Sequence, residues 1–126
     1  MAEIGMAGRS ESVVTQANTA KTVGSGSLEV FATPMMAALM ENAAVSALVL
    51  PEDQTSVGTH LDMKHIAATP VGMKVWAEAK IVEMEGRKLV YQIEAFDEKE
   101  KIGEGRHERV IVNTEKFMLK TNGKLQ

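Results

Sequence analysis

The segment from residue 29 to residue 50, EVFATPMMAALMENAAVSALVL, limits the folds that this chain can adopt. Pro34 suits the first turn of a helix, where its missing N–H leaves no hydrogen bond unmade, and Thr33 before it is a good N-cap. Pro51 cannot continue a helix, so the segment predicts one long helix over about residues 34–50. Because that helix is apolar nearly all round, it must be buried on most of its sides.

A membrane-spanning interpretation of the same segment is disfavoured. A bilayer span needs roughly 20 predominantly apolar residues. Here Pro34, Glu41, Asn42 and Ser46 interrupt the run, and the sequence contains no second candidate. We therefore expect a buried helix of a soluble domain and no contact with a membrane.

The apolar pattern changes its period after Pro51. Alternation of apolar and polar residues predicts strands at 56–66, 74–84, 89–96 and 102–113, and EKFMLK is a candidate extension of the last one. Before the helix, ESVVTQANTAKT at 11–22 is rich in β-branched residues and predicts a first strand.

The order of strand, long apolar helix and four strands predicts an α+β fold. We expect one antiparallel sheet wrapped round a single central helix, forming one domain over residues 1–126. A sheet covers only one side of such a helix, so a second copy of the chain is the natural cover for the rest. This predicts a homodimer and leaves a tetramer open.

Composition excludes several classes of function. The net charge of −3 and the lack of a basic patch argue against nucleic acid as a partner. The chain has no cysteine, which excludes disulfides, thiol nucleophiles and thiolate metal sites and fits a cytoplasmic location. No histidine–carboxylate spacing indicates a metal site, and the N-terminus has no secretory signal, so we expect neither a metal nor export.

Glu41 is the most conspicuous candidate for a functional residue, because it is the one charged residue inside the predicted helix. Its neighbours on the same helix face, one or two turns away, are apolar and mostly small: Ala37, Ala38, Ala44, Val45 and Leu48. A carboxylate buried on such a face is costly unless it is paired. Glu41 is therefore either part of a structural ion pair or part of a site, and the small alanines around it leave room for a small ligand.

Two other residues have both a structural and a functional interpretation. His65 shares a strand face with Leu61 and Met63, which suits a core histidine as well as a catalytic one. Thr33 is an N-cap by default, yet it stands where free N–H groups of a helix can bind an oxyanion. With Glu41 these residues could form an acyl-transfer set, although sequence spacing does not show that they meet.

The remaining histidines and one arginine are weaker candidates. His60 lies on the opposite strand face from His65 and is expected at the surface or at an interface. His107 is expected on a strand face near the mouth of a site. Arg109 could contact the phosphates of a coenzyme, but an exposed structural arginine is the simpler interpretation.

Three stretches, EVFATPMMAALMENAA, SVGTHLDMKHIAATPVGM and GEGRHERVIVN, resemble the hotdog thioesterase family that includes fluoroacetyl-CoA thioesterase. The resemblance covers roughly residues 13–113. It implies a hotdog fold and hydrolysis of an acyl-CoA, with coenzyme A as part of the substrate and no cofactor. It also implies that Thr33, Glu41 and His65 form the catalytic set and that Gly58 helps to bind the acyl-thioester carbonyl.

One departure from that family concerns the segment before the helix. Fluoroacetyl-CoA thioesterase has a longer segment there, with a phenylalanine that covers the site, whereas this chain has the short polar KTVGSGSLE. The resemblance therefore supports a thioesterase, but it does not support selectivity for fluoroacetate. Two alternatives stay open: a hotdog dehydratase or hydratase acting on acyl thioesters, and a non-catalytic module that binds acyl-CoA.

Overall fold

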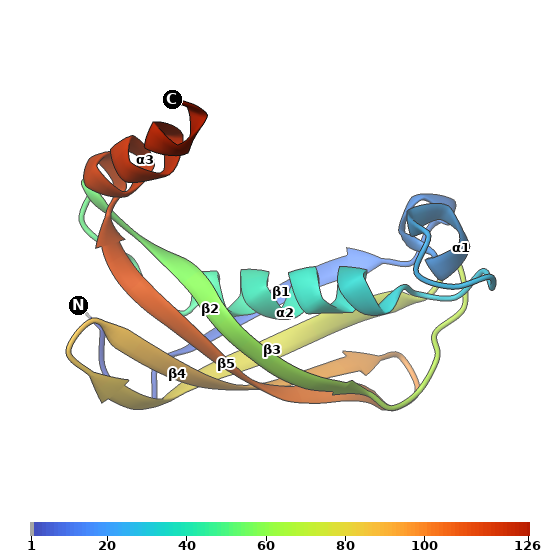
Figure 1. Cartoon of the computed structure of the whole chain (residues 1–126). Coiled ribbons are helices and arrows are strands. Elements are labelled where there is room, and N and C mark those ends of the chain that lie inside the picture. The colour runs from blue at the N-terminus through green and yellow to red at the C-terminus, as the bar shows by residue number, and fades with distance from the viewer. Residues whose placement is uncertain (1) are drawn as a thin grey trace.

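A five-stranded antiparallel sheet curls round one long helix, α2 (Thr33–Ser46), in the computed structural model, which describes residues 2–126 (Figure 1). The strands are β1 (Ala7–Val13), β2 (Gln54–His65), β3 (Lys74–Glu85), β4 (Lys88–Asp97) and β5 (Lys101–Asn113). Their order across the sheet is β1-β3-β4-β5-β2, and every neighbouring pair is antiparallel. The architecture is the one that the sequence predicts.

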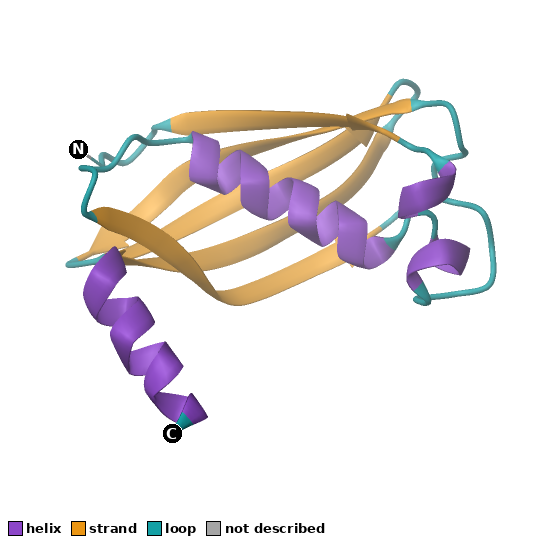
Figure 2. Cartoon of the chain, turned by 90° about the horizontal axis from the view of Figure 1, so that it is seen from above, coloured by secondary structure: helices purple, strands orange, loops and turns teal. Residues whose placement is uncertain are grey.

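Helix α2 lies across the concave face of the sheet, and Figure 2 shows it from above. Its buried side chains recur every three or four residues: Met36, Leu39, Met40, Ala43 and Ala44. They pack against the alternating inward residues of the two central strands, which are Val75, Ala77, Ala79 and Ile81 on β3 and Leu89, Tyr91, Ile93 and Ala95 on β4. These two strand faces are the predicted ones.

The outward side of α2 is not covered in the single chain. Ala38 is exposed there, and Val45 retains 48% of its accessible surface. The helix is therefore buried on one side only, although its sequence is apolar nearly all round. None of the helices within residues 2–126 has both the length and the apolar character that crossing a bilayer requires.

The first strand is earlier and shorter than predicted. Residues 11–22 were expected to be extended, but β1 ends at Val13 and helical turns follow at Gln16–Asn18 (η1) and Ala20–Val23 (α1). The threonines responsible for the β-like composition act as caps instead. The Thr15 side chain accepts a hydrogen bond from the Ala17 N–H, and the Thr19 side chain accepts one from the Thr22 N–H. Both bonds stabilise local helical turns.

Both ends of the long helix also differ from the prediction. Ala32, not Thr33, is the N-cap, and no side chain caps this end. Thr33 is the first helical residue, so its hydroxyl is free to bond elsewhere. The helix ends at Ser46 rather than near Leu50, and the Ser46 hydroxyl bonds back to the Ala43 carbonyl oxygen in the last turn.

The C-terminal segment is a helix, α3 (Thr114–Asn122), and not an extension of β5. The Asn113 side chain accepts a hydrogen bond from the Lys116 N–H, and Glu115 lies in the first turn. An asparagine cap and an early acidic residue both stabilise a helix start. Figure 1 shows α3 projecting away from the sheet at the end opposite α1.

Gly8 allows α2 to approach β1 closely. A Cβ atom at this position would overlap the Ala43 carbonyl oxygen and the Ala47 backbone nitrogen, neither of which can rotate away. Ser10, two residues along β1, donates from its hydroxyl to the Leu39 carbonyl oxygen over 2.6 Å. The register of helix on sheet thus depends on direct backbone contact along one edge.

We predict that Gly8→Ala lowers the free energy of unfolding by about 1–3 kcal/mol, because α2 must shift away from the sheet to admit the methyl group. Urea denaturation measures this loss. Gly123→Ala is the matched control, because a Cβ at Gly123 would meet nothing within 4 Å and its φ of −59° is ordinary for alanine. The control should change stability by less than about 0.5 kcal/mol. Equal effects of the two substitutions would contradict the close approach.

Candidate active site

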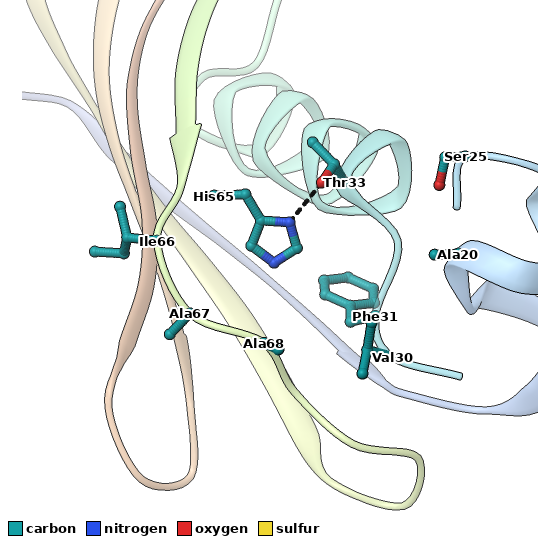
Figure 3. Close-up of a pocket in the computed structure, with 9 residues that line it drawn as sticks. All are labelled: Ala20, Ser25, Val30, Phe31, Thr33, His65, Ile66, Ala67 and Ala68. Atoms are coloured by element: carbon teal, nitrogen blue, oxygen red, sulfur yellow. Dashed lines mark hydrogen bonds between the residues drawn. The ribbon is translucent and has the colours of Figure 1, made fainter. Parts of the chain in front are cut away.

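Thr33 and His65 meet where the start of α2 faces the end of β2. The Thr33 Oγ1 atom lies 2.7 Å from His65 Nδ1, a short hydrogen bond that Figure 3 marks. Burial lowers the pKa of His65, and the nearby backbone of Ala67 partly offsets that change. The imidazole is therefore neutral at pH 7. In the tautomer with a bare Nδ1 it accepts the Thr33 proton, which is how a histidine activates a hydroxyl.

A pocket of about 330 Å³ opens beside this pair. It is lined by Ala20, Ser25, Val30, Phe31, Thr33, His65, Ile66, Ala67 and Ala68. In Figure 3 the Phe31 ring lies beside the imidazole, and Ser25 stands across from Thr33. Among residues 2–126, His65 Nε2 is the one buried side-chain nitrogen or oxygen without a hydrogen-bond partner. A ligand atom in the pocket could supply that partner.

The start of α2 offers less to an oxyanion than its sequence suggests. Pro34 has no N–H, and those of Met35 and Met36 both donate to the Ala32 carbonyl oxygen. The Thr33 N–H forms no hydrogen bond with the described part of the chain. One backbone donor, rather than a set of them, is therefore available beside the pocket.

Glu41 belongs to a second cluster, further along α2. Gly58 on β2 faces it, and the position that a Gly58 Cβ would occupy lies 3.2 Å from Glu41 Oε1. The same position lies 3.1 Å from His107 Cε1 and 3.3 Å from Arg109 Nη1. A side chain at this position would crowd all three groups, which is a steric reason for a glycine here. Glu41 and Arg109 are not in direct ion-pair contact, so the space over Gly58 separates their charges.

Arg109 is buried and held by three hydrogen bonds. The expectation of an exposed structural arginine was therefore wrong. Its Nε donates to Ser56 Oγ over 2.8 Å and its Nη2 to the Ser56 carbonyl oxygen over 2.9 Å. Its Nη1 donates to His107 Nε2 over 3.2 Å. Burial lowers the pKa of Arg109, while the negative charge of Glu41 raises it, and the side chain remains a cation at neutral pH.

The two clusters are separate within one chain. The structure brings Thr33 to His65, and it brings Glu41 to Gly58 and Arg109. Thr33 and Glu41 are eight positions apart on α2, which corresponds to about 12 Å along the helix axis. The three residues expected to form a catalytic set therefore do not meet in a single copy of the protein.

Three residues of the second cluster were not singled out as site residues from the sequence. Ser56 holds Arg109, and His107, expected near the mouth of a site, is 1% exposed beneath it. Tyr91 on β4 is directly opposite His107 in the sheet, and burial raises the pKa of its hydroxyl while Arg109 opposes that change. Period-two spacing places His107 and Arg109 on one face of β5, and this spacing was the one sign in the sequence that they belong to the same site. His60 is exposed, in agreement with the expectation of a surface residue.

The site contains no arrangement suited to a metal. Within residues 2–126, no group of three or more histidine, aspartate or glutamate side chains is placed to hold an ion. The groups that the two clusters offer for chemistry are a hydroxyl–imidazole pair and a carboxylate near a guanidinium.

The model of a protein family described as fluoroacetyl-CoA-specific thioesterase, FlK, matches residues 14–115. The chain belongs to this family. A fluoroacetyl-CoA thioesterase of Streptantibioticus cattleyicolor is 42% identical over 98 residues, which cover 76% of this chain and 70% of that protein. The FlK family likeness thus extends over both clusters.

Solved structures agree with this assignment and confirm the hotdog fold. A variant of FlK in complex with acetyl-CoA has a TM-score of 0.91 at 34% identity, with 99% of this chain and 100% of that chain covered. A Thermus thermophilus protein described as a thioesterase superfamily member has a TM-score of 0.85 at 28% identity and covers 98% and 97% of the two chains.

We predict that stability falls as the pH falls through about 6.5, in part because of His65. Its pKa in the folded chain lies below the ordinary value, so the unfolded chain binds more protons in this range. The free energy of unfolding therefore rises with pH across this window. Urea denaturation between about pH 5 and pH 8 should show that the free energy of unfolding depends less steeply on pH for His65→Gln, because glutamine cannot titrate. An identical dependence in both proteins would contradict the lowered pKa.

Proposed function

We propose that this protein is a thioesterase that hydrolyses an acyl-CoA to the free acid and coenzyme A. The observation that carries the proposal is the Thr33–His65 hydrogen bond at a pocket beside the start of α2. A neutral imidazole bonded to a hydroxyl is suited to moving a proton during acyl transfer. Membership of the FlK family supports the same chemistry, because the family is described as a thioesterase.

The complete active site, on this proposal, lies between two copies of the chain. Glu41 stands about 12 Å along the helix axis from Thr33 and faces Gly58 and Arg109 instead, so within one copy the two belong to different clusters. A second copy that covers the exposed apolar side of α2 would bring its own Glu41 cluster to the Thr33–His65 pair. The exposure of Ala38 and Val45 supports this cover. The functional unit is then a homodimer with two shared sites, and pairs of dimers remain a further arrangement to test.

Residues of both clusters take part in the proposed reaction. Glu41 either removes a proton from the attacking water or attacks the carbonyl itself, and the two routes differ in whether an acyl-enzyme forms. His65, a neutral imidazole, first accepts the proton that the attacking water or Thr33 gives up, directly or through Glu41, and then passes it to the departing thiolate. Thr33 positions the carboxylate or water. Thr33 could also attack directly after giving its proton to His65. In each route one water adds to the carbonyl carbon, the C–S bond breaks, and the thiol leaves with a proton.

The polar contacts of the substrate are assigned to Gly58 and Arg109. Gly58 has no side chain and is exposed, so a substrate carbonyl oxygen can approach the β2 backbone there, and the nearby Arg109 guanidinium stabilises the charge that develops. Arg109 is 7% exposed, which favours this inner role over contact with the coenzyme's phosphates. No cofactor is required, because coenzyme A arrives as part of the substrate.

The acyl group is proposed to be small, because the pocket beside His65 is bounded by Ala67, Ala68 and Phe31. An FlK variant has been crystallised with acetyl-CoA, a substrate class of this size. A reducing cytoplasm is the proposed location, which a chain without cysteine tolerates.

We predict that the wild type releases thiol from short acyl-CoAs and that Glu41→Gln lowers kcat by about a hundredfold or more, because the amide can neither take a proton nor attack. A thiol-reactive dye measures the release, and the protein adds no background because it has no cysteine. Glu115→Gln, the same change at an exposed position of α3, is the matched control and should retain activity.

Two results of the same assay would contradict the thioesterase. Loss of enoyl-CoA absorbance without thiol release would identify a hydratase or dehydratase. Tight binding of acyl-CoA without any turnover would identify a non-catalytic module.

The shared site makes a separate prediction about mixed dimers. His65→Ala and Glu41→Gln chains should each be inactive alone, but a heterodimer of the two retains one site with both wild-type residues. Random mixing of the two chains, by joint refolding, should therefore restore about a quarter of the wild-type activity. Mixing that restores nothing, while heterodimers are detected by mass spectrometry, would show that each chain carries its own complete site.

A further inference from the structure

His107 lies beneath Arg109 and belongs to no step of the proposed reaction. Its side chain is 1% exposed, and its ring faces that of Tyr91 with the centroids 6.2 Å apart. Its Nδ1 atom lies 2.7 Å from the His60 carbonyl oxygen, and its Nε2 atom lies 3.2 Å from Arg109 Nη1. Both ring nitrogens are therefore engaged inside the protein.

These two neighbours determine where the ring proton is. A carbonyl oxygen can only accept a hydrogen bond, so the proton is on Nδ1. A guanidinium can only donate, so Nε2 must be bare. His107 is consequently a neutral imidazole with one defined tautomer, and its Nε2 lone pair points at Arg109.

We propose that His107 is a positioning residue, which holds the Arg109 guanidinium over Gly58 by accepting a hydrogen bond at Nε2. This inference rests on the proposed role of Arg109 in the thioesterase site. Ser56 holds the other side of the guanidinium through two acceptors. Without the His107 acceptor, the Nη1 end that is nearest to Gly58 loses its fixed direction.

The surroundings of His107 keep its ring neutral. It is faced by Glu41 from α2, Tyr91 from β4 and Arg109 from its own strand, while Glu108 is the adjacent charged residue on β5. Burial is the main cause that lowers the pKa of His107, and the positive charge of Arg109 lowers it further against the opposing carboxylates. If the ring were protonated, Nε2 would carry a hydrogen and could no longer accept from Arg109.

Two substitutions separate positioning from simple packing. His107→Gln can place its amide oxygen near the Nε2 position and accept from Arg109, but it loses the bond to the His60 carbonyl. His107→Asn can keep the bond to the His60 carbonyl through its Nδ2, but it cannot reach Arg109. A purely structural role predicts that the asparagine variant is at least as good as the glutamine variant.

We expect kcat/KM within about threefold of wild type for His107→Gln and a loss of about tenfold or more for His107→Asn. Thermal unfolding checks that both variants are folded. Arg106→Gln, on the exposed face of the same strand, is the control and should match the wild type. Equal losses in the two His107 variants, or the reverse order, would overturn the proposal.

Nitrogen NMR of the wild-type protein tests the inference without turnover and without a variant of His107. Only three histidines need to be assigned, and His60→Gln removes one signal to help. At pH 7 we expect His107 to carry its proton on Nδ1 with a bare Nε2. A proton on Nε2, or a charged ring, would overturn the proposal even if the protein hydrolyses acyl-CoA. The expected tautomer would support it even if no thiol is released.

Discussion

The packing of α2 against the concave face of the sheet is the contact on which the rest of the structure depends. Its buried side chains, from Met36 to Ala44, form the core with the inward faces of β3 and β4. The backbone contact at Gly8 sets how deeply the helix lies. Because the helix is fixed in this way, its first residue reaches the end of β2 and its middle reaches Gly58. Both candidate clusters follow from that one placement.

Strand β2 is the second element that determines the two candidate clusters, because it supplies a residue to each of them. His65 stands at its end and Gly58 near its start, and the register with β5 slips beside Gly58. A bulge of this kind bends a strand and redirects its side chains. The neighbouring strand β5 contributes His107 and Arg109 from one face, so with Tyr91 on β4 the polar groups of the second cluster come from four elements. A buried cation there is tolerated because each of its three nitrogens donates a hydrogen bond and a carboxylate lies nearby.

The separation of the two clusters within one chain limits the chemistry that a single copy could perform. The hydroxyl–imidazole pair joins the start of α2 to the end of β2, whereas the carboxylate lies about two turns further along the helix. On the proposed function, assembly of two copies is then what creates a competent site, and a single chain would hold two incomplete halves. The apolar outer side of α2 would serve both as the interface and as the wall that excludes water from the reaction.

Several features could be predicted from the sequence because they depend on local pattern. The long helix, the inward faces of β3 and β4 and the exposed position of His60 follow from periodicity and from the prolines that bracket the helix. Elements whose residues suit two local structures were predicted wrongly. Thr15 and Thr19 have the composition of a strand but cap short helical turns, and Asn113 starts a helix where a strand was expected to continue.

The sequence by itself determined the fold class, the family and the identity of the polar residues that a buried helix and its neighbouring strands carry. Only the tertiary structure decided which of them meet. Thr33 bonds to His65 rather than to its own helix, and Glu41 faces Arg109 rather than His65. The physical reason is that these contacts join residues more than ten positions apart, and their geometry depends on helix placement and strand register. Neither quantity is encoded in the spacing of residues along the chain.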